Sequence, residues 1–313
     1  MAESQNADAV LMVRPVRFEA NQETAVTNEF QRLAGNPESA ELQRLALAEF
    51  DGLVQLLRDA GVTVCVFEDT PEPHTPDSIF PNNWLSLHGD GTVVTYPMLT
   101  ANRRAERKSE IIEQLRDVHG FTLGQPIDFA PFEEAGKILE GTGSLVLDRA
   151  HRVAYACLSP RTDPGLVKEF GQRLGYRCST FEAVGPGGQA VYHTNVLLAV
   201  GSTTAVLCAE AIVDGAQRHS VMASLENSGH ELLAITAEQM LHFAGNMLEV
   251  RSASGDRFWV MSRQAETSLT AEQRARLCRD ATILAAPMET IERCSGGSVR
   301  CMLAEIHLPR VAR

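Results

Sequence analysis

The sequence predicts an α/β fold in a single domain spanning residues 1–313. Segments with the alternating pattern of strands occur in pairs, and helical segments separate these pairs in blocks of roughly 50 to 70 residues. The chain is 44% apolar, which suits a globular core, and it contains no linker or low-complexity segment. These observations favour one closed domain of repeated mixed units over a simple βαβ array.

Helical and strand patterns alternate from the first third of the chain onward. Apolar residues between Leu42 and Leu57 recur at helical spacing, and "GVTVCVFED" then has the composition of a strand. The segment "WLSLHGDGTVVTYPM" predicts a hairpin, because Asp90-Gly91 supplies the positive φ angles that a tight turn needs. A charged helix is expected from about residue 103 to residue 118.

The rest of the chain repeats this organisation. Helices are expected over residues 164–174, 218–228 and 271–279. Strands are expected in "ILEGTGSLVLD", "HRVAYACLS", "RCSTFEAV", "TNVLLAV", "TAVLCAE", "NMLEVRS", "RFWVMS" and "CMLAEIHL".

The net charge and the hydropathy pattern limit which kinds of molecule the protein can bind. The net charge of -12 would repel nucleic acid and anionic lipid, whose binding requires clustered Lys and Arg. The chain has no export signal and no uninterrupted run of about 18 apolar residues. We therefore expect a soluble, cytoplasmic protein with a small-molecule partner. Its seven cysteines are an odd number at irregular positions, so a disulfide framework is not expected.

Cys301 is a candidate nucleophile. It follows the turn from Gly296 to Arg300, which leads into the last expected strand. A thiol at an open strand end, with flanking backbone amides facing a developing negative charge, is placed for nucleophilic chemistry. Taken alone, the pattern also fits a buried core thiol or a disulfide between Cys294 and Cys301.

A thiolate nucleophile requires a histidine for proton transfer and an acid that orients the histidine. His193 follows the glycine-rich turn "GPGGQ" and begins an expected strand, so its ring can lie at a rim. Glu140 precedes two glycines inside an otherwise apolar strand pair. Taken singly, His193 also fits a residue that caps a strand, and Glu140 fits a partner in a salt bridge.

Four motifs in order resemble the guanidino-group-modifying superfamily, which includes arginine deiminases, dimethylarginine dimethylaminohydrolases and amidinotransferases. They are "TPDSIFPNNW", "LEGTG", "YHTN" and "GGSVRCM", and the resemblance extends from "MVRP" to the last expected strand. The resemblance implies the pentein fold, a five-bladed pseudo-symmetric α/β propeller, with no metal and no organic cofactor. The scattered Cys and His residues, which show no close metal-ligand spacing, agree with that expectation.

The resemblance also implies a hydrolytic mechanism. Cys301 would attack the central carbon of a guanidinium or similar group and form a covalent intermediate. His193 would protonate the leaving nitrogen and then activate water, while Glu140 would orient the imidazole and contact a substrate nitrogen.

Substrate anchors follow from the same resemblance. Asp77 matches the carboxylate that holds the α-amino group in dimethylarginine hydrolases. Arg103 and Arg161 match the arginines that clamp the α-carboxylate, although Arg103 lies in a run that otherwise predicts the solvated start of a helix.

Two asparagines depart from the arginine-processing pattern. Asn83 and Asn195 stand where relatives carry acids that neutralise a guanidinium. An asparagine offers a donor and an acceptor without charge, which suits the neutral ureido group of citrulline. The sequence therefore predicts a citrulline hydrolase that yields ornithine, ammonia and carbon dioxide through an S-carbamoyl intermediate.

Other functions stay open at this stage. If both asparagines only serve turns, the chain fits an arginine deiminase or a dimethylarginine dimethylaminohydrolase. An amidinotransferase and a non-catalytic amino-acid-binding protein are further alternatives. The sequence is also compatible with a homo-oligomer.

Overall fold

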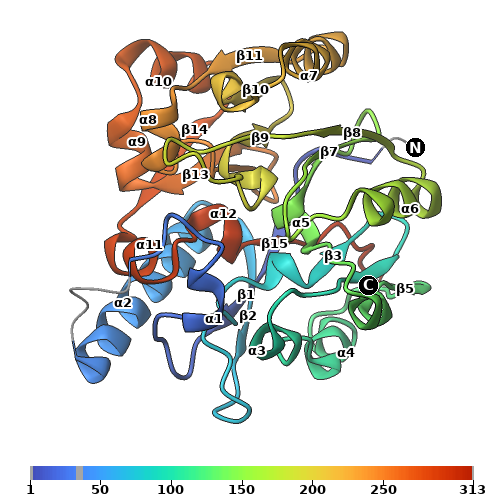
Figure 1. Cartoon of the computed structure of the whole chain (residues 1–313). Coiled ribbons are helices and arrows are strands. Elements are labelled where there is room, and N and C mark those ends of the chain that lie inside the picture. Colours follow the sequence, from blue (N-terminus) through green and yellow to red (C-terminus); the bar gives the residue numbers. More distant parts are fainter. Residues whose placement is uncertain (1–2, 33–37, 312–313) are drawn as a thin grey trace.

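The computed structural model describes residues 3–32 and 38–311. Within these residues the strands form five three-stranded sheets, and four of the sheets are built from consecutive strands (Figure 1). The strands are β1 (Ala9–Arg14), β2 (Thr63–Glu68), β3 (Leu85–Leu87), β4 (Val93–Thr95), β5 (Pro126–Asp128), β6 (Leu145–Asp148), β7 (Val153–Cys157), β8 (Arg177–Phe181), β9 (Leu198–Val200), β10 (Thr204–Leu207), β11 (Glu231–Ala234), β12 (Leu248–Arg251), β13 (Arg257–Ser262), β14 (Thr282–Ala286) and β15 (Ala304–Glu305).

Each sheet repeats one topology, so each is a blade of the propeller. The first two strands of a blade are antiparallel, as β6 and β7 are, and the third strand lies parallel to the second. A parallel pair needs a crossover connection, and helices supply it. The first blade takes β15 from the end of the chain, where Val10 pairs with Glu305, so the two chain ends together close the ring.

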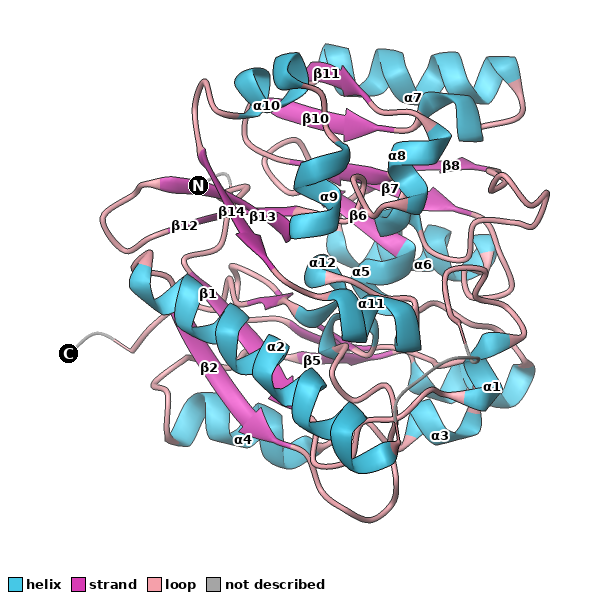
Figure 2. Ribbon diagram, turned by 90° about the vertical axis from the view of Figure 1, so that its left-hand side faces the viewer, coloured by secondary structure: helices cyan, strands magenta, loops and turns pink. Residues whose placement is uncertain are grey.

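The helices lie at two depths. Figures 1 and 2 show the short helices α5 and α12 near the centre of the molecule, while α7 and α4 lie at opposite ends. The α-helices are α1 (Gln22–Ala25), α2 (Ser39–Asp59), α3 (Ala101–Arg104), α4 (Ser109–Asp117), α5 (Gly141–Ser144), α6 (Pro164–Leu174), α7 (Gly215–Asn227), α8 (Ala237–Leu241), α9 (Arg263–Ser268), α10 (Ala271–Leu277), α11 (Glu289–Ser295) and α12 (Val299–Met302). Four 3₁₀ turns are described: η1 (Pro81–Asn83), η2 (Ala130–Ala135), η3 (Thr194–Val196) and η4 (Ala209–Ala211).

Peripheral helices begin and end where their sequences indicate. The Asp163 side chain accepts the Leu166 N–H at the start of α6, Pro164 occupies the first turn, and Gly175 ends the helix at φ 72°. Helix α2 buries one apolar face, including Phe50 and Leu53, against the first sheet and β14. Burial of each such side chain contributes about 1.5 to 3 kcal/mol.

The fold predicted from the sequence is confirmed as a mixed α/β pentein propeller, and most expected strands and peripheral helices are present. The expectation of one charged helix over residues 103–118 is wrong. Helix α3 ends at Arg104 and α4 begins at Ser109, because the chain turns between them as Arg107 pairs with Glu133 and Lys108 with Asp69. None of the described helices is long and apolar enough to span a bilayer.

Three expected strands begin later than the alternation suggested. The residues before β6, β9 and β15 form the short central turns α5, η3 and α12 instead. The cause is close packing at the ring centre. A Cβ on Gly141 would lie 2.3 Å from the carbonyl oxygen of Asn82, and Gly141 has a φ of 44°, so only glycine fits there.

Candidate active site

Cys301 lies in α12 at the centre of the ring and is only 4% exposed. The expectation that it opens a strand is wrong, because β15 begins only at Ala304. Two side-chain amides donate toward its sulfur: Asn246 Nδ2 lies 3.3 Å and Asn195 Nδ2 lies 3.7 Å from Sγ. Donors around a sulfur stabilise negative charge on it. All seven cysteines, Cys294 included, are free.

His193 and Glu140 form a buried pair. His193 Nε2 donates to Glu140 Oε2 across 2.8 Å. Burial lowers the pKa of His193 to about 4, and the contact with Glu140 only partly offsets this effect. Burial opposes ionisation of Glu140 as well, but Arg161, His193 and Arg103 outweigh it and hold the pKa of Glu140 well below its usual range. A neutral imidazole oriented by a carboxylate can accept a proton from a nearby thiol or water.

Arg103 is deeply buried, contrary to the expectation of a solvated helix start. Its Nε and Nη2 each lie 2.9 Å from a carboxylate oxygen of Glu106, which gives a bidentate pair. Its Nη1 donates to Asn83 Oδ1 at 2.8 Å. Arg103 therefore supports the pocket wall through Asn83.

The amide of Asn83 has one fixed orientation. Because a guanidinium only donates hydrogen bonds, Asn83 must turn its oxygen toward Arg103. Its Nδ2 is buried and has no hydrogen-bond partner among the described residues. A Cβ on Gly143 would meet both this nitrogen, at 2.4 Å, and His193 Nδ1, at 2.8 Å, so the free amide lies beside the imidazole.

The segment from residue 21 to residue 31 covers Asp77 and Arg161. Asp77 Oδ2 accepts a hydrogen bond from Asn21 at 2.7 Å, while its Oδ1 is buried without a partner among the described residues. Arg161 Nη2 donates to the Thr27 hydroxyl at 2.7 Å, and its Nη1 lies 3.4 Å from Glu140. We call residues 21–31 the covering segment.

Cys301 and His193 line one small cavity. Its volume is about 20 Å³, room for roughly one water molecule. Its lining includes Asp77, Asn83, Arg103, Arg161, His193 and Cys301, together with Tyr192 and with Asn28 of the covering segment. Asn195 reaches the same centre through Cys301. A volume of this size is too small for a free amino acid.

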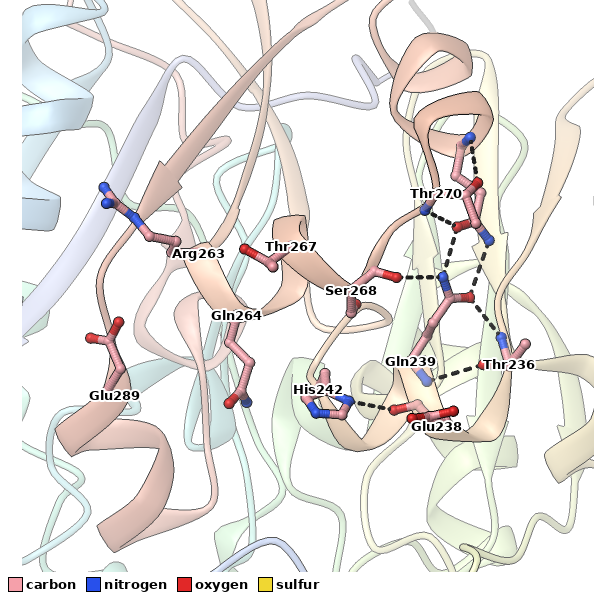
Figure 3. Close-up of a pocket in the computed structure, with 11 residues that line it drawn as sticks. Thr236, Glu238, Gln239, His242, Arg263, Gln264, Thr267, Ser268, Thr270 and Glu289 are labelled. Carbon is pink, nitrogen blue, oxygen red and sulfur yellow. Dashed lines mark hydrogen bonds between the residues drawn. The ribbon is translucent and has the colours of Figure 1, made fainter.

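A second cavity, of about 730 Å³, lies away from these residues (Figure 3). Its polar groups largely satisfy one another: Gln239 Nε2 donates to the Ser268 carbonyl at 2.8 Å and to Gln273 at 2.7 Å. These glutamines complete the capping boxes of α8 and α10. This cavity offers no group comparable to the buried sulfur, imidazole and carboxylate.

The sequence analysis missed Asn246. Its Oδ1 accepts the Arg300 N–H at 3.1 Å and its Nδ2 donates to the Asn195 carbonyl at 2.9 Å, so it ties α12 to η3. Asn246 lies just before the first strand of its blade, as Asn83 does in another blade. Aligning the blades on these positions would have indicated it. Asn82, whose buried amide atoms have no partner among the described residues, was missed as well.

A profile described as "N,N dimethylarginine dimethylhydrolase, eukaryotic" matches residues 14–308. The chain belongs to this family. Its members are hydrolases that act on carbon–nitrogen bonds of arginine-type substrates, within the guanidino-group-modifying superfamily. No curated protein sequence matches the chain.

Solved structures share the fold at low sequence identity. ArgZ, an arginine dihydrolase from the ornithine–ammonia cycle in Cyanobacteria, superposes with a TM-score of 0.74 at 15% identity over 97% of this chain and 41% of its own. AgrE in complex with ornithine and NAD+ gives 0.74 at 17% identity over 97% and 40%. A dimethylarginine dimethylaminohydrolase adduct with S-methyl-L-thiocitrulline gives 0.64 at 15% identity over 96% and 100%. This chain thus spans about two fifths of ArgZ and AgrE.

Proposed function

We propose that the protein hydrolyses the terminal ureido group of free citrulline, yielding ornithine, ammonia and carbon dioxide. The observation that supports this most directly is the locked amide of Asn83. Its free Nδ2 offers a buried donor beside His193. A ureido oxygen can accept a hydrogen bond from that donor. A guanidinium has only N–H donors, so it would place another positively polarised N–H group against the Asn83 amide.

Asn195 supplies the complementary group. Its Nδ2 points to the Cys301 sulfur, and its Oδ1 is buried without a partner among the described residues. An acceptor there suits the terminal NH₂ of a ureido group. A buried cation would instead require an unpaired carboxylate, and the Glu140 carboxylate already contacts His193 and Arg161.

The amino-acid end of the substrate has matching anchors. The free Oδ1 of Asp77 can accept from an α-ammonium group. Arg161 can bind an α-carboxylate in place of the Thr27 hydroxyl when the covering segment opens. Arg103 faces the same cavity but already pairs with Glu106, so it acts on the substrate mainly through Asn83.

In the proposed reaction, the imidazole of His193 carries each proton that is transferred. Cys301 Sγ forms a bond to the ureido carbon, and its proton passes to the neutral His193. The resulting imidazolium protonates the leaving nitrogen as the carbon–nitrogen bond breaks, which releases ornithine and leaves an S-carbamoyl enzyme. His193 then takes a proton from water, the hydroxide attacks the carbamoyl carbon, and the carbon–sulfur bond breaks as the imidazolium returns its proton to the departing sulfur. Carbamate leaves and decomposes to ammonia and carbon dioxide.

Product analysis with single substrates tests this proposal. Citrulline, arginine and dimethylarginine are supplied separately, and ornithine, citrulline and ammonia are measured. We expect ornithine and ammonia from citrulline. Arginine and dimethylarginine, which are cationic, should not be turned over faster than citrulline. Release of citrulline from arginine, with citrulline itself inert, would overturn the assignment. Adding an amine acceptor separates hydrolysis from transfer, because a transferase would modify the acceptor.

Cys301→Ala provides the matched control. The variant should lose turnover and still bind citrulline in calorimetry, because the amide and carboxylate contacts stay in place. Turnover equal to that of the wild type would eliminate Cys301 as the nucleophile.

A further inference from the structure

Asp148, His151 and His230 form a cluster outside the catalytic cavity. Asp148 ends β6, His151 lies in the turn before β7, and His230 lies between α7 and β11. The ligand atoms of the three side chains all lie within 4.8 Å of one another. The cluster therefore joins the third blade to the fourth, across 82 residues of sequence.

The two imidazoles aim one nitrogen each at the same carboxylate. His151 Nδ1 lies 2.9 Å from Asp148 Oδ1, and His230 Nε2 lies 2.9 Å from Asp148 Oδ2. The ring centroids are 5.6 Å apart and the rings are nearly perpendicular, at 86°. Three ligand atoms bound at about 2.0 to 2.2 Å around a tetrahedral zinc ion lie roughly 3.3 Å from one another. The two nitrogen–oxygen distances of 2.9 Å and the 4.8 Å limit for the whole set bracket that value.

Burial distinguishes this cluster from ordinary surface groups. The side chains of Asp148 and His230 are 0% and 2% exposed, whereas that of His151 is 44% exposed. The cluster thus has two fixed members and one side open to solvent, which leaves a coordination position for water. His230 Nδ1 makes no hydrogen bond to the described residues, so it can carry the ring proton when Nε2 exchanges its hydrogen bond to Asp148 for a metal ion.

We propose that Asp148, His151 and His230 bind a divalent cation of the zinc class. Two imidazoles with one carboxylate suit Zn²⁺ and similar transition metals, whereas Mg²⁺ and Ca²⁺ prefer oxygen ligands throughout. The ion would tie the β6–β7 turn to the segment between α7 and β11, and so stabilise the folded ring. Spacing along the chain does not indicate this site, because His230 is far from the other two residues in the chain. The proposal is independent of the reaction at Cys301.

Zinc titration of the chelator-treated Cys301→Ala protein tests the proposal, because this background removes the catalytic thiol as a competing ligand. Calorimetry should show one equivalent of Zn²⁺ bound, with a rise in the unfolding temperature. In the same background, His151→Ala should weaken binding at least tenfold and abolish the temperature rise. His151 is exposed, so its loss should not prevent folding. His219→Ala, an exposed histidine on α7, should bind as the background does.

Cobalt absorption gives a second measurement. Co²⁺ bound to nitrogen and oxygen ligands should show d–d bands without sulfur-to-metal charge transfer, and His151→Ala should remove these bands. Absence of bound zinc would overturn the proposal. Equal affinity in His151→Ala, or a sulfur charge-transfer band, would overturn it too, because each would place the metal elsewhere.

Discussion

The proposed substrate choice depends on a hydrogen bond between two buried side chains. Arg103 can only donate, so it fixes the oxygen of Asn83 toward itself and leaves the nitrogen facing His193. Glu106 holds Arg103 in place through two contacts of 2.9 Å. In the proposed function, the selectivity for a neutral group is thus set by Arg103, which need not touch the ureido group.

Asn83→Asp should reverse this preference. The carboxylate keeps an acceptor for Arg103 but replaces the free donor with negative charge, so kcat/KM for citrulline should fall by about 100-fold. Arginine should bind more tightly than it does to the wild type. Steady-state kinetics with both substrates measure these changes. Asn227→Asp, which adds the same charge at an exposed position, serves as the control. Unchanged citrulline kinetics in Asn83→Asp would contradict this role for the amide.

Asn246 is a positioning residue whose contribution can be separated into two parts. Asn246→Ala removes both the acceptor for the Arg300 N–H and the donor to Sγ, whereas Asn246→Asp keeps the acceptor. Both variants should lower kcat about 10- to 100-fold with little change in KM, because the donor stabilises charge on sulfur. Alkylation of Cys301 by iodoacetamide should slow in both. Normal kcat in Asn246→Asp would show that anchoring of α12 suffices.

At the scale of elements, the alternation pattern predicted a strand where the structure has the short central helix α5. Leu139 to Leu147 resemble a strand in sequence, but residues 141–144 form a turn packed against η1. Gly143 in this turn lies against Asn83 and His193. Because glycine has no side chain, there is room for both of these groups.

Gly143→Ala should impair catalysis while leaving the fold intact. The new methyl would sit 2.4 Å from Asn83 Nδ2 and must displace it, and a shift of about 1 Å can cost on the order of 100-fold in rate. The kcat/KM for citrulline measures the effect. Gly52→Ala, in α2 with no atom within 4 Å of the added carbon, should leave kcat/KM unchanged. Equal activity in the two variants would contradict the proposed packing.

Helix α11 contains a buried acid, Glu292. Ser298, just before α12, donates to Glu292 Oε1 at 2.6 Å. Burial raises the pKa of Glu292 to about 7, since hydrogen bonds from Ser262 and Ser298 offset burial only in part. Between pH 4.5 and 7 the unfolded chain therefore releases this proton while the folded chain retains it. Through this group, stability falls as the pH rises across that window.

Glu292→Gln should remove this dependence while keeping the acceptor for Ser298. Relative to the wild type, the variant should be of similar stability at pH 4.5 and more stable by about 2 kcal/mol at pH 8. Urea unfolding at several pH values measures the difference. Glu272→Gln, which changes an exposed acid on α10, should show no such trend. A difference in stability that shrinks as the pH rises would contradict the assignment.

At the scale of the whole molecule, the sequence predicted what depends on local chemistry. The bounds of α6 follow from Asp163, Pro164 and Gly175, and the repeated strand pairs follow from alternation. The central turns could not be predicted in the same way, because contacts between blades impose them. The burial of Arg103 and the role of Asn246 likewise arise only when distant segments meet.

The central claim concerns groups that different blades contribute. It requires a sulfur, an imidazole and neutral amides to act on one carbon atom. Acid quenching during turnover, followed by mass spectrometry of the peptide containing Cys301, tests it most directly. With citrulline, we predict a carbamoyl group on Cys301 that is absent in Cys301→Ala. An amidino group formed from arginine, with no carbamoyl adduct from citrulline, would contradict the account.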